Sequence, residues 1–532
     1  MGEAKTRENN FMQRTTIDQK EMKGIKGQLH NEGKNEDAVE KIFPLNSIQK
    51  AYISGRNPET FWGGRSCQMC VVTHMKEIKK ETMHKALTIL EQKYPILKAY
   101  VFGEEGIKIC DKDFGYPIVT EEDVSVLKKR LIAFNLPLSG PLYQAYIAGK
   151  ERRLVVLVDM IISDAASMYI FIDEIKKIYE QILKGNDVEN FIEKPMKIQN
   201  FNFHEKKVSL EETINIASTM LPISNYIPEY SKYTTTHRDY FIDCKAWNQF
   251  KEIAAHEGID PISALLAIYS VCLGMCSASD VITLNMTVTT RNFEKKVEHG
   301  IYDYTDVVYV SVPIHIENML EVAINAKKAK KDALVHQLGK STEIARRMIC
   351  QDPMNGYSPY VFTCTVGLGE KLGRASFLKE SSEIATSTPQ VIIDEQIYEK
   401  ENGILICWDS IDEAFLIPTM VEELFEHLCL VMDKACREDD FWHTKVIQIM
   451  QSPLCEQGRV LSEIAQGSKA IEYLSKEGIY IYMEHGKLKY RAPKGKMSET
   501  KIAFLKKYKD YILKYFNTLE GTDGYTKQDF QK

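Results

Sequence analysis

The sequence predicts a mixed α/β chain that folds as two lobes followed by a small separate domain. The 532 residues are too many for one ordinary core. Strand and helix patterns alternate along the first part of the chain and begin afresh after a polar stretch near 205–231. After Ser452 the pattern changes again, to a helix, two short strands and a helix. Each of these segments carries enough apolar residues for a core of its own.

Composition excludes several classes of protein. The 68 basic and 74 acidic side chains give a net charge of -6, which offers no footprint for nucleic acid or an anionic membrane. The sequence contains no apolar run of about 18 residues, the length of a membrane span. The polar first 40 residues lack a signal-peptide core, and the 12 cysteines form no disulfide-like framework. We therefore expect a reduced, cytoplasmic protein that binds neither membrane nor nucleic acid.

The first lobe is predicted to begin after a polar, disordered leader. Apolar residues at helical spacing predict a helix over 83–94, which Pro95 closes. The run LVVLVDMII at 154–162 is typical of a strand buried on both faces, interrupted only by Asp159. A second helix over 171–182 follows it after a polar loop. This unit of strand, polar loop and helix is a common place for a functional site.

The second lobe and the third segment follow the same reasoning. Helical and alternating patterns predict further elements at these positions: a helix after Pro261, strands over 281–289 and 307–314, a helix over about 461–476, strands over 479–483 and 487–491, and a helix from Ser498.

The polar loop after the buried strand carries the most informative side chains. Asp159, Asp164 and Ser167 leave the strand together, and buried carboxylates need partners. From the residues alone, a structural ion pair and a functional site are equally good interpretations. Cys67 and Cys70 form a CxxC, but the second ligand pair of a zinc site is missing, so we expect no metal.

The stretch DMIISDAAS at 159–167 resembles the D-x4-D-x2-S hallmark of the cyclisation subfamily of condensation domains in nonribosomal peptide synthetases. Amide-forming relatives carry HHxxxDG there, and Met160 stands where they hold the catalytic histidine. A methionine has no titratable proton, so the histidine-based reaction is excluded. FPLNSIQKAYISGR at 43–56 and KYPILKAYV further on resemble other motifs of the subfamily. The resemblance implies two chloramphenicol-acetyltransferase-like lobes in a V shape.

Further motifs assign site residues by this resemblance. SPYVFTCTVGLGE and STPQVIIDEQ place the family's catalytic threonine at Thr363 and its catalytic aspartate at Asp394. LNMTVTTR ends at Arg291, which is expected to pair with Asp164 across the lobes, so Asp159, Asp164, Ser167 and Arg291 form a structural set. The substrate tunnel is expected to include four residues: Asn285, Asp303, Thr305 and Gln396.

Two motifs depart from the family pattern. The glycine and serine of a GDFTS-like motif are replaced by Tyr302 and Asp306 in YDYTD, and DHQ has become DEQ. A tyrosine in place of glycine blocks close backbone approach, so a reshaped or less active channel is one expectation.

The last segment resembles the tubulysin-type docking domain, with GKLKYRAPKGKMSE as its characteristic stretch at 486–499. Such domains capture a short C-terminal tail of a partner synthase, and an exposed hairpin edge suits that role. They usually precede the cyclisation domain, whereas this one follows, which leaves the direction of docking open. The predicted order is leader 1–40, first lobe 41–215, second lobe 216–450, linker 451–468, docking domain 469–517 and polar tail 518–532.

The resemblance implies a reaction on carrier-bound thioesters. The amine of a carrier-bound cysteine, serine or threonine attacks an upstream acyl thioester, and its side chain then attacks the new amide carbonyl. Loss of water leaves a thiazoline or oxazoline. A carboxyl that gives and retakes a proton fits this dehydration, so Asp394 is assigned to it and Thr363 to positioning.

Other components are expected from partners. The chain carries no carrier-protein serine motif and no adenylation-type loop, so donor and acceptor carrier proteins act in trans and hold the substrates on phosphopantetheine. No cofactor is expected on the chain itself. Two alternatives stay open: amide formation without cyclisation, and an inactive scaffold that recruits carrier proteins.

Overall fold

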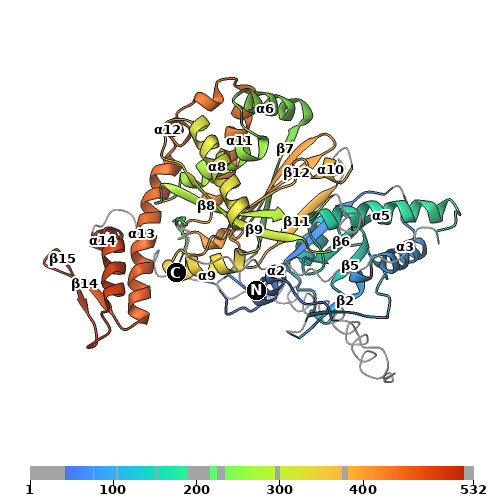
Figure 1. Ribbon diagram of the computed structural model, residues 1–532, viewed down its shortest axis with the longest axis horizontal. Helices are drawn as coiled ribbons and strands as arrows, with labels where there is room; N and C mark the ends of the chain where they lie inside the picture. Colours follow the sequence, from blue (N-terminus) through green and yellow to red (C-terminus); the bar gives the residue numbers. More distant parts are fainter. Residues whose placement is uncertain are drawn as a thin grey trace, which may run out of the picture. The chain divides into compact units, whose positions relative to one another are not determined.

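The computed structural model describes residues 42–520 apart from 61, 76, 104–105, 151, 189–215, 225–233, 294–299 and 374–381. The predicted leader and most of the predicted crossover therefore lie outside the described residues. Within this range the chain is mixed α/β, with a five-stranded sheet, a six-stranded sheet and two small two-stranded sheets. Figure 1 shows helices covering the faces of the two larger sheets.

The first sheet has the strand order β11-β1-β6-β5-β4. Its central strand β6 (Arg153–Asp159) is the apolar run that the sequence predicted, and its residues from Leu154 to Asp159 are all buried. The remaining elements of this part are α2 (Ser47–Gly55), β1 (Gln68–Thr73), α3 (Lys80–Lys93), β2 (Ala99–Phe102), β3 (Gly106–Ile109), β4 (Ile118–Thr120), α4 (Val124–Ala133), β5 (Tyr143–Ala148) and α5 (Ala165–Leu183).

The second sheet has the strand order β7-β13-β12-β10-β8-β9. Its strands are β7 (Thr236–Asp243), β8 (Val281–Thr289), β9 (Thr305–Pro313), β10 (Tyr360–Cys364), β12 (Ile393–Lys400) and β13 (Gly403–Ser410). Its helices are α6 (Cys244–His256), α7 (Pro261–Gly274), α8 (Met319–His336), α9 (Ser341–Gln351), α10 (Leu368–Lys371), α11 (Met420–Arg437) and α12 (Val446–Ile449).

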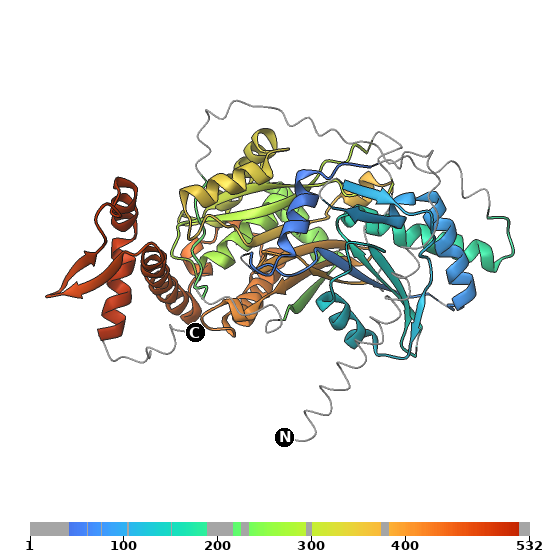
Figure 2. The same cartoon turned by 90° about the horizontal axis from the view of Figure 1, so that it is seen from below.

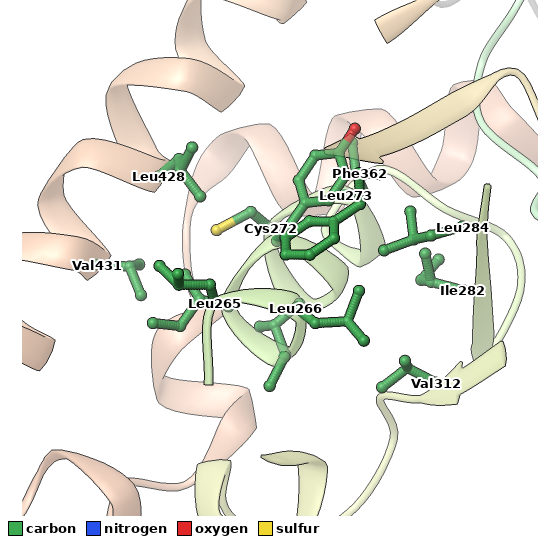
Figure 3. Packing of buried hydrophobic residues seen from close by; sticks show 14 of the residues in the cluster. Leu265, Leu266, Cys272, Leu273, Ile282, Leu284, Val312, Phe362, Leu428 and Val431 are labelled. Carbon is green, nitrogen blue, oxygen red and sulfur yellow. The ribbon is translucent and has the colours of Figure 1, made fainter. Parts of the chain in front are cut away.

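Helix α7 forms the centre of the second core. It is apolar all round, as expected of a helix with no exposed face, and from Ser263 to Gly274 every residue is buried. In Figure 3, Leu266 and Leu273 lie close to sheet residues such as Leu284, while Leu265 lies toward Leu428 of α11. No single helix in the described range is long and apolar enough to cross a membrane. Helices α6 and α7, which meet at a bend, together reach the length and apolar composition of a span, but by those two criteria only.

Strand β11 (Glu383–Ser387) joins the first sheet although it lies between β10 and β12 of the second sheet in the chain. It pairs antiparallel with β1, with Met69 opposite Thr386. These residues belong to the range predicted for the second lobe, because a sequence pattern does not reveal which sheet a strand joins. Without β11, β1 would be an edge strand with unpaired backbone groups.

The C-terminal part consists of α13 (Pro453–Lys476), β14 (Tyr480–Glu484), β15 (Lys487–Arg491) and α14 (Glu499–Glu520). In Figure 2 the hairpin, drawn in orange-red, projects from the helices. The helix predicted from about residue 461 starts at Pro453, so the segment assigned as a linker is mostly helical. Ser452 caps this helix and Pro453 occupies its first turn, a start signal that the sequence analysis did not use. Residues 518–520, assigned to the polar tail, complete α14.

Candidate functional site

One face of the second sheet lines a cavity of about 300 Å³. Val361 lies opposite Asp394, and Thr363 lies opposite Gln396, on the adjacent strands β10 and β12. Alternate residues of a strand share a face, so this register puts all four on the cavity side. Asn285 of β8 and Thr305 of β9 line the same cavity. The structure therefore brings together five of the predicted residues: Thr363, Asp394, Asn285, Thr305 and Gln396.

Residues of the first lobe form the opposite wall. Tyr52 of α2, Cys67, Gln68 of β1 and Met160 after β6 all line the cavity. Met160 thus presents a thioether where the amide-forming relatives are expected to hold a base. Among the described residues, no group of three or more histidines, cysteines or acids is placed to hold a metal ion.

Asp394 is the acid of the cavity. Its side chain is almost fully buried, and Oδ1 has no hydrogen-bond partner. Oδ2 accepts one long bond, 3.3 Å, from the Thr388 hydroxyl. Burial, followed by the charge of Asp409, raises the pKa of Asp394 to about 7, although bonds from Gln396 and Thr388 act in the other direction. At neutral pH this carboxyl can therefore both give and accept a proton.

Thr363 and Asn285 add polar groups to the same wall. The Thr363 hydroxyl lies 3.0 Å from the Thr287 hydroxyl, to which it donates. The side-chain oxygen of Asn285 is buried without a partner. Buried polar atoms are rarely left unpaired, so Asn285 Oδ1 and Asp394 Oδ1 are two positions that a bound substrate can satisfy.

Gln396 is held in place by its neighbours. Its Nε2 donates to Thr386 Oγ1 at 2.5 Å and to Asp409 Oδ2 at 3.1 Å. Its carbonyl oxygen accepts from the Tyr398 hydroxyl at 2.7 Å. With its amide engaged at both ends, Gln396 is a fixed part of the wall next to Asp394.

The acid at the end of the buried strand β6 has a structural partner. Asp159 accepts a charged hydrogen bond from Arg56 and one of 3.0 Å from the backbone of Ile161. Burial raises the pKa of Asp159 to about 6, and Arg56 opposes that shift. Asp159 does not line the cavity. Its geometry is that of a buried ion pair at the base of the loop.

The predicted pair of Asp164 and Arg291 is confirmed. Arg291 Nη2 lies 2.8 Å from Asp164 Oδ1, and Asp164 also caps α5 by accepting from the Ser167 backbone at 2.7 Å. The Ser167 hydroxyl donates to the Tyr302 carbonyl at 2.7 Å and accepts from the Tyr302 backbone at 3.0 Å. None of these four residues lines the cavity. They join the N-terminus of α5 to the second lobe.

The residues that depart from the family pattern lie away from the cavity. Tyr302 packs in the apolar core beside the first sheet, and the centroid of its ring lies 5.7 Å from that of Tyr304. The side chain of Asp306 accepts a hydrogen bond of 2.6 Å from the Gly339 backbone. Glu395 points to the opposite face of β12, where Trp408 donates to it at 3.3 Å. Asp303, predicted for the tunnel, is also absent from the cavity wall: it is fully buried and accepts from the Thr305 backbone at 2.9 Å.

Sequence reasoning missed two residues beside Asp394. Asp409 of β13 lies directly opposite it, and His237 of β7 lies opposite Asp409. Alternation along each strand places these residues on a face, but the register of the β12–β13 hairpin and the pairing of β13 with the distant β7 set which of them meet.

The family comparisons agree with this architecture. The family model of the Condensation domain matches residues 39–338, more than half of the chain, so the chain belongs to that family. The model of the TubC N-terminal docking domain matches residues 468–517. The chain is thus a condensation-type domain followed by a docking domain.

Several curated proteins and solved structures are similar to it. Bacitracin synthase 1 of Bacillus licheniformis is 26% identical over 438 residues, which cover 76% of this chain and 8% of that protein. Phenyloxazoline synthase MbtB of Mycobacterium sp. (strain MCS) is 22% identical over 422 residues, which cover 75% of this chain and 36% of that protein. The chain therefore spans well under half the length of these relatives. The cyclization-docking bidomain of EpoB from Sorangium cellulosum shares the fold, with a TM-score of 0.61 at 19% identity over 82% of this chain and 94% of that one.

Proposed function

We propose that this chain is a heterocyclisation domain of a nonribosomal peptide assembly line. It condenses a carrier-bound acyl or peptidyl thioester with a carrier-bound cysteine, serine or threonine, and then removes water to form a thiazoline or oxazoline. One observation carries this proposal: Asp394, a buried acid with a pKa raised to about 7, faces the cavity with one oxygen unpartnered. A relative named phenyloxazoline synthase supports the same class of product.

The proposed chemistry uses two of the cavity residues. Asp394 protonates the departing hydroxyl and then takes up the proton from the ring nitrogen, so one carboxyl serves as acid and base. Thr363 fixes the hydroxyl or the acid by hydrogen bonding. A positioned proton transfer of this kind contributes roughly 100-fold to 10,000-fold in rate.

Amide formation without cyclisation is the first alternative. In that case the enzyme would act by holding the two thioesters together, and Asp394 would have no proton to transfer. The absence of a titratable proton on Met160 is compatible with both reactions. The raised pKa of a cavity acid favours the reaction that needs proton transfer.

The second alternative, an inactive scaffold, was motivated by Tyr302 and Asp306. Both side chains lie away from the cavity, so these substitutions leave the lining at Asp394 and Thr363 in place. This removes the structural reason for expecting a blocked channel.

Partners complete the proposed system. Donor and acceptor carrier proteins present the substrates on phosphopantetheine, and the docking domain captures the C-terminal tail of a partner synthetase. Strand β15 pairs only with β14 within the described residues, which leaves its outer edge open to an added strand. Tyr482 and Tyr490 are exposed on this hairpin and can pack against side chains of such a tail.

The test is a reaction with an acyl-loaded donor carrier and a cysteinyl-loaded acceptor carrier. The intact mass of the acceptor-bound product is compared for the wild type, Asp394→Ala and the exposed-site control Glu413→Gln. We expect a product lighter by one water from the wild type and the control, and a product that retains the water from Asp394→Ala. Uncyclised amide from all three would favour the condensation reaction, and no product with any loaded pair would favour the scaffold.

A further inference from the structure

A row of titratable side chains crosses the second sheet beside the main cavity. On the antiparallel strands β12 and β13, Asp394 lies directly opposite Asp409, and on β13 and β7, Asp409 lies opposite His237. Directly opposed residues share a face and have Cβ atoms roughly 5 Å apart. The backbone register therefore forces two carboxyl groups and an imidazole into contact range.

The middle member of the row is surrounded by donors. His237 Nδ1 lies 2.6 Å from Asp409 Oδ1. Asp409 Oδ2 accepts from the Thr386 backbone at 2.9 Å, from the Thr386 hydroxyl at 2.8 Å and from Gln396 at 3.1 Å. Hydrogen bonds to a carboxylate favour its ionised form. Burial lowers the pKa of His237, but its hydrogen bonds to Asp239 and Asp409 outweigh burial and raise that pKa to about 9, so the imidazole is charged at neutral pH.

Asp394 has the opposite environment. Its Oδ2 accepts a long hydrogen bond from Thr388, and Oδ1 has no partner. Gln396 and Thr386 also favour its charged form, but burial outweighs them. Asp394 and Asp409 both line a second, smaller cavity, which Arg65 and Thr235 complete. When two carboxyl groups share a site, the one with fewer donors holds the proton. The asymmetry of the row therefore assigns the proton of the pair to Asp394.

We propose that Asp409, held in place by hydrogen bonds from His237 and Thr386, is a positioning residue that keeps a proton on Asp394 until the dehydration step. This inference rests on the proposed function, in which Asp394 transfers that proton. In the step, the C–O bond of the ring carbinol breaks as the hydroxyl takes the proton of Asp394 and leaves as water. The ring N–H proton returns to Asp394 as the C=N bond forms. One water is lost and the acid is regenerated.

Other charged and titratable groups face the pair from each side. Arg65, Cys67 and Tyr398 face it from the cavity side. Glu395 and Tyr269 lie on the core side of the sheet, where burial keeps the pKa of each well above its ordinary value. Asp239 and Lys128 interact with His237 at the edge of the sheet. Asp409 is the charged group that lies directly opposite Asp394, and after burial its charge is the largest cause of the raised pKa of Asp394.

The test measures the protonation of Asp394 directly. The infrared absorption of its protonated carboxyl is obtained as the difference between the wild type and Asp394→Asn, and is followed against pH. The same difference is measured in two variants, Asp409→Asn and the exposed control Glu413→Gln. Asp409→Asn keeps the shape of the side chain and an oxygen that accepts from Thr386. We expect a midpoint near pH 7 in the wild type and in the control, and a midpoint lower by at least one unit with Asp409→Asn.

The pH dependence of product formation is the second readout. Each unit by which the midpoint falls lowers the protonated fraction of Asp394 about tenfold above that midpoint, so Asp409→Asn should lose cyclised product at a lower pH than the wild type. A wild-type midpoint near 4, which requires no Asp409 variant, overturns the inference. A midpoint unchanged by a folded Asp409→Asn overturns it as well. If the midpoints shift as expected but the wild type forms only uncyclised amide, the effect of Asp409 stands and the proposed function fails.

Discussion

At the scale of single residues, Asp394 and Thr363 share one wall of the cavity but have different environments. Asp394 is buried, with a pKa raised to about 7. Thr363 is partly buried and donates to Thr287 at 3.0 Å. The family resemblance located both residues from the sequence. The physical causes of the raised pKa, burial first and then the charge of Asp409, were not visible there, because they depend on the packing of the sheet and on the register of β12 against β13.

Replacing Thr363 by valine keeps the shape of the side chain and removes its hydroxyl. One hydrogen bond is worth about 1 kcal/mol, so we expect cyclisation to slow roughly fivefold to tenfold. Amide formation should change less than cyclisation, because the attack of the amine does not require this hydroxyl in the proposed mechanism. Single-turnover mass measurements of amide and heterocycle separate the two steps. Equal slowing of both steps in Thr363→Val, or no recovery in Thr363→Ser, would contradict the assigned role.

At the scale of elements, the agreement between sequence and structure depends on the kind of pattern. The periodic helix closed by Pro95 is α3, and the predicted strand over 281–289 is β8. Local patterns fix such elements because the side chains of one segment form one face. The sheet that β11 joins was not predicted, since this depends on the distant strand β1 near the start of the chain. Likewise, Asp303 was placed in the tunnel by its motif, whereas the turn before β9 directs it into the protein.

The junction between α5 and the second lobe should be important for stability. Arg291→Met removes the partner of Asp164 and leaves a buried carboxylate without its ion pair, which typically costs 3–5 kcal/mol, about ten times the cost at an exposed pair. Urea unfolding measures this change. The matched control is Arg437→Met, which breaks an exposed i,i+4 pair with Asp433 and should cost about 0.5 kcal/mol or less. Similar losses for the two variants would show that the buried pair contributes little.

At the scale of the whole molecule, the docking domain is held to the second lobe by a buried polar cluster. Asp352, after α9, accepts from the Tyr508 hydroxyl at 2.7 Å and pairs with Lys507 at 3.0 Å. Asn355 donates to Gln466 of α13 at 2.7 Å. The same loop continues into Gly356 and Tyr357, which line the main cavity. One segment thus contacts the docking domain and forms part of the cavity wall.

Because Asp352 is ionisable, the contact between α14 and the loop after α9 should weaken in acid. Burial raises the pKa of Asp352, but the bonds from Tyr508 and Lys507 outweigh it and lower the pKa below the ordinary value. A lowered pKa contributes stability above the unfolded value of about 4, and that stability is lost as the pH falls through the folded value. Hydrogen exchange of α14 between about pH 3 and pH 6 should therefore show weakening below about pH 4. Asp352→Asn should weaken α14 above this transition, to about the level that the wild type reaches below it, and should remove the transition; an unchanged transition would assign it to another group.

The most direct test of the central claim isolates the loss of water from amide formation. A synthetic uncyclised acyl-cysteinyl amide is loaded on the acceptor carrier, and its intact mass is followed with the wild type and with Asp394→Asn. The account predicts that the wild type converts this amide to a product lighter by one water and that Asp394→Asn leaves it unchanged. An amide that survives the wild type intact, while the same preparation still joins donor and acceptor substrates, would contradict heterocyclisation.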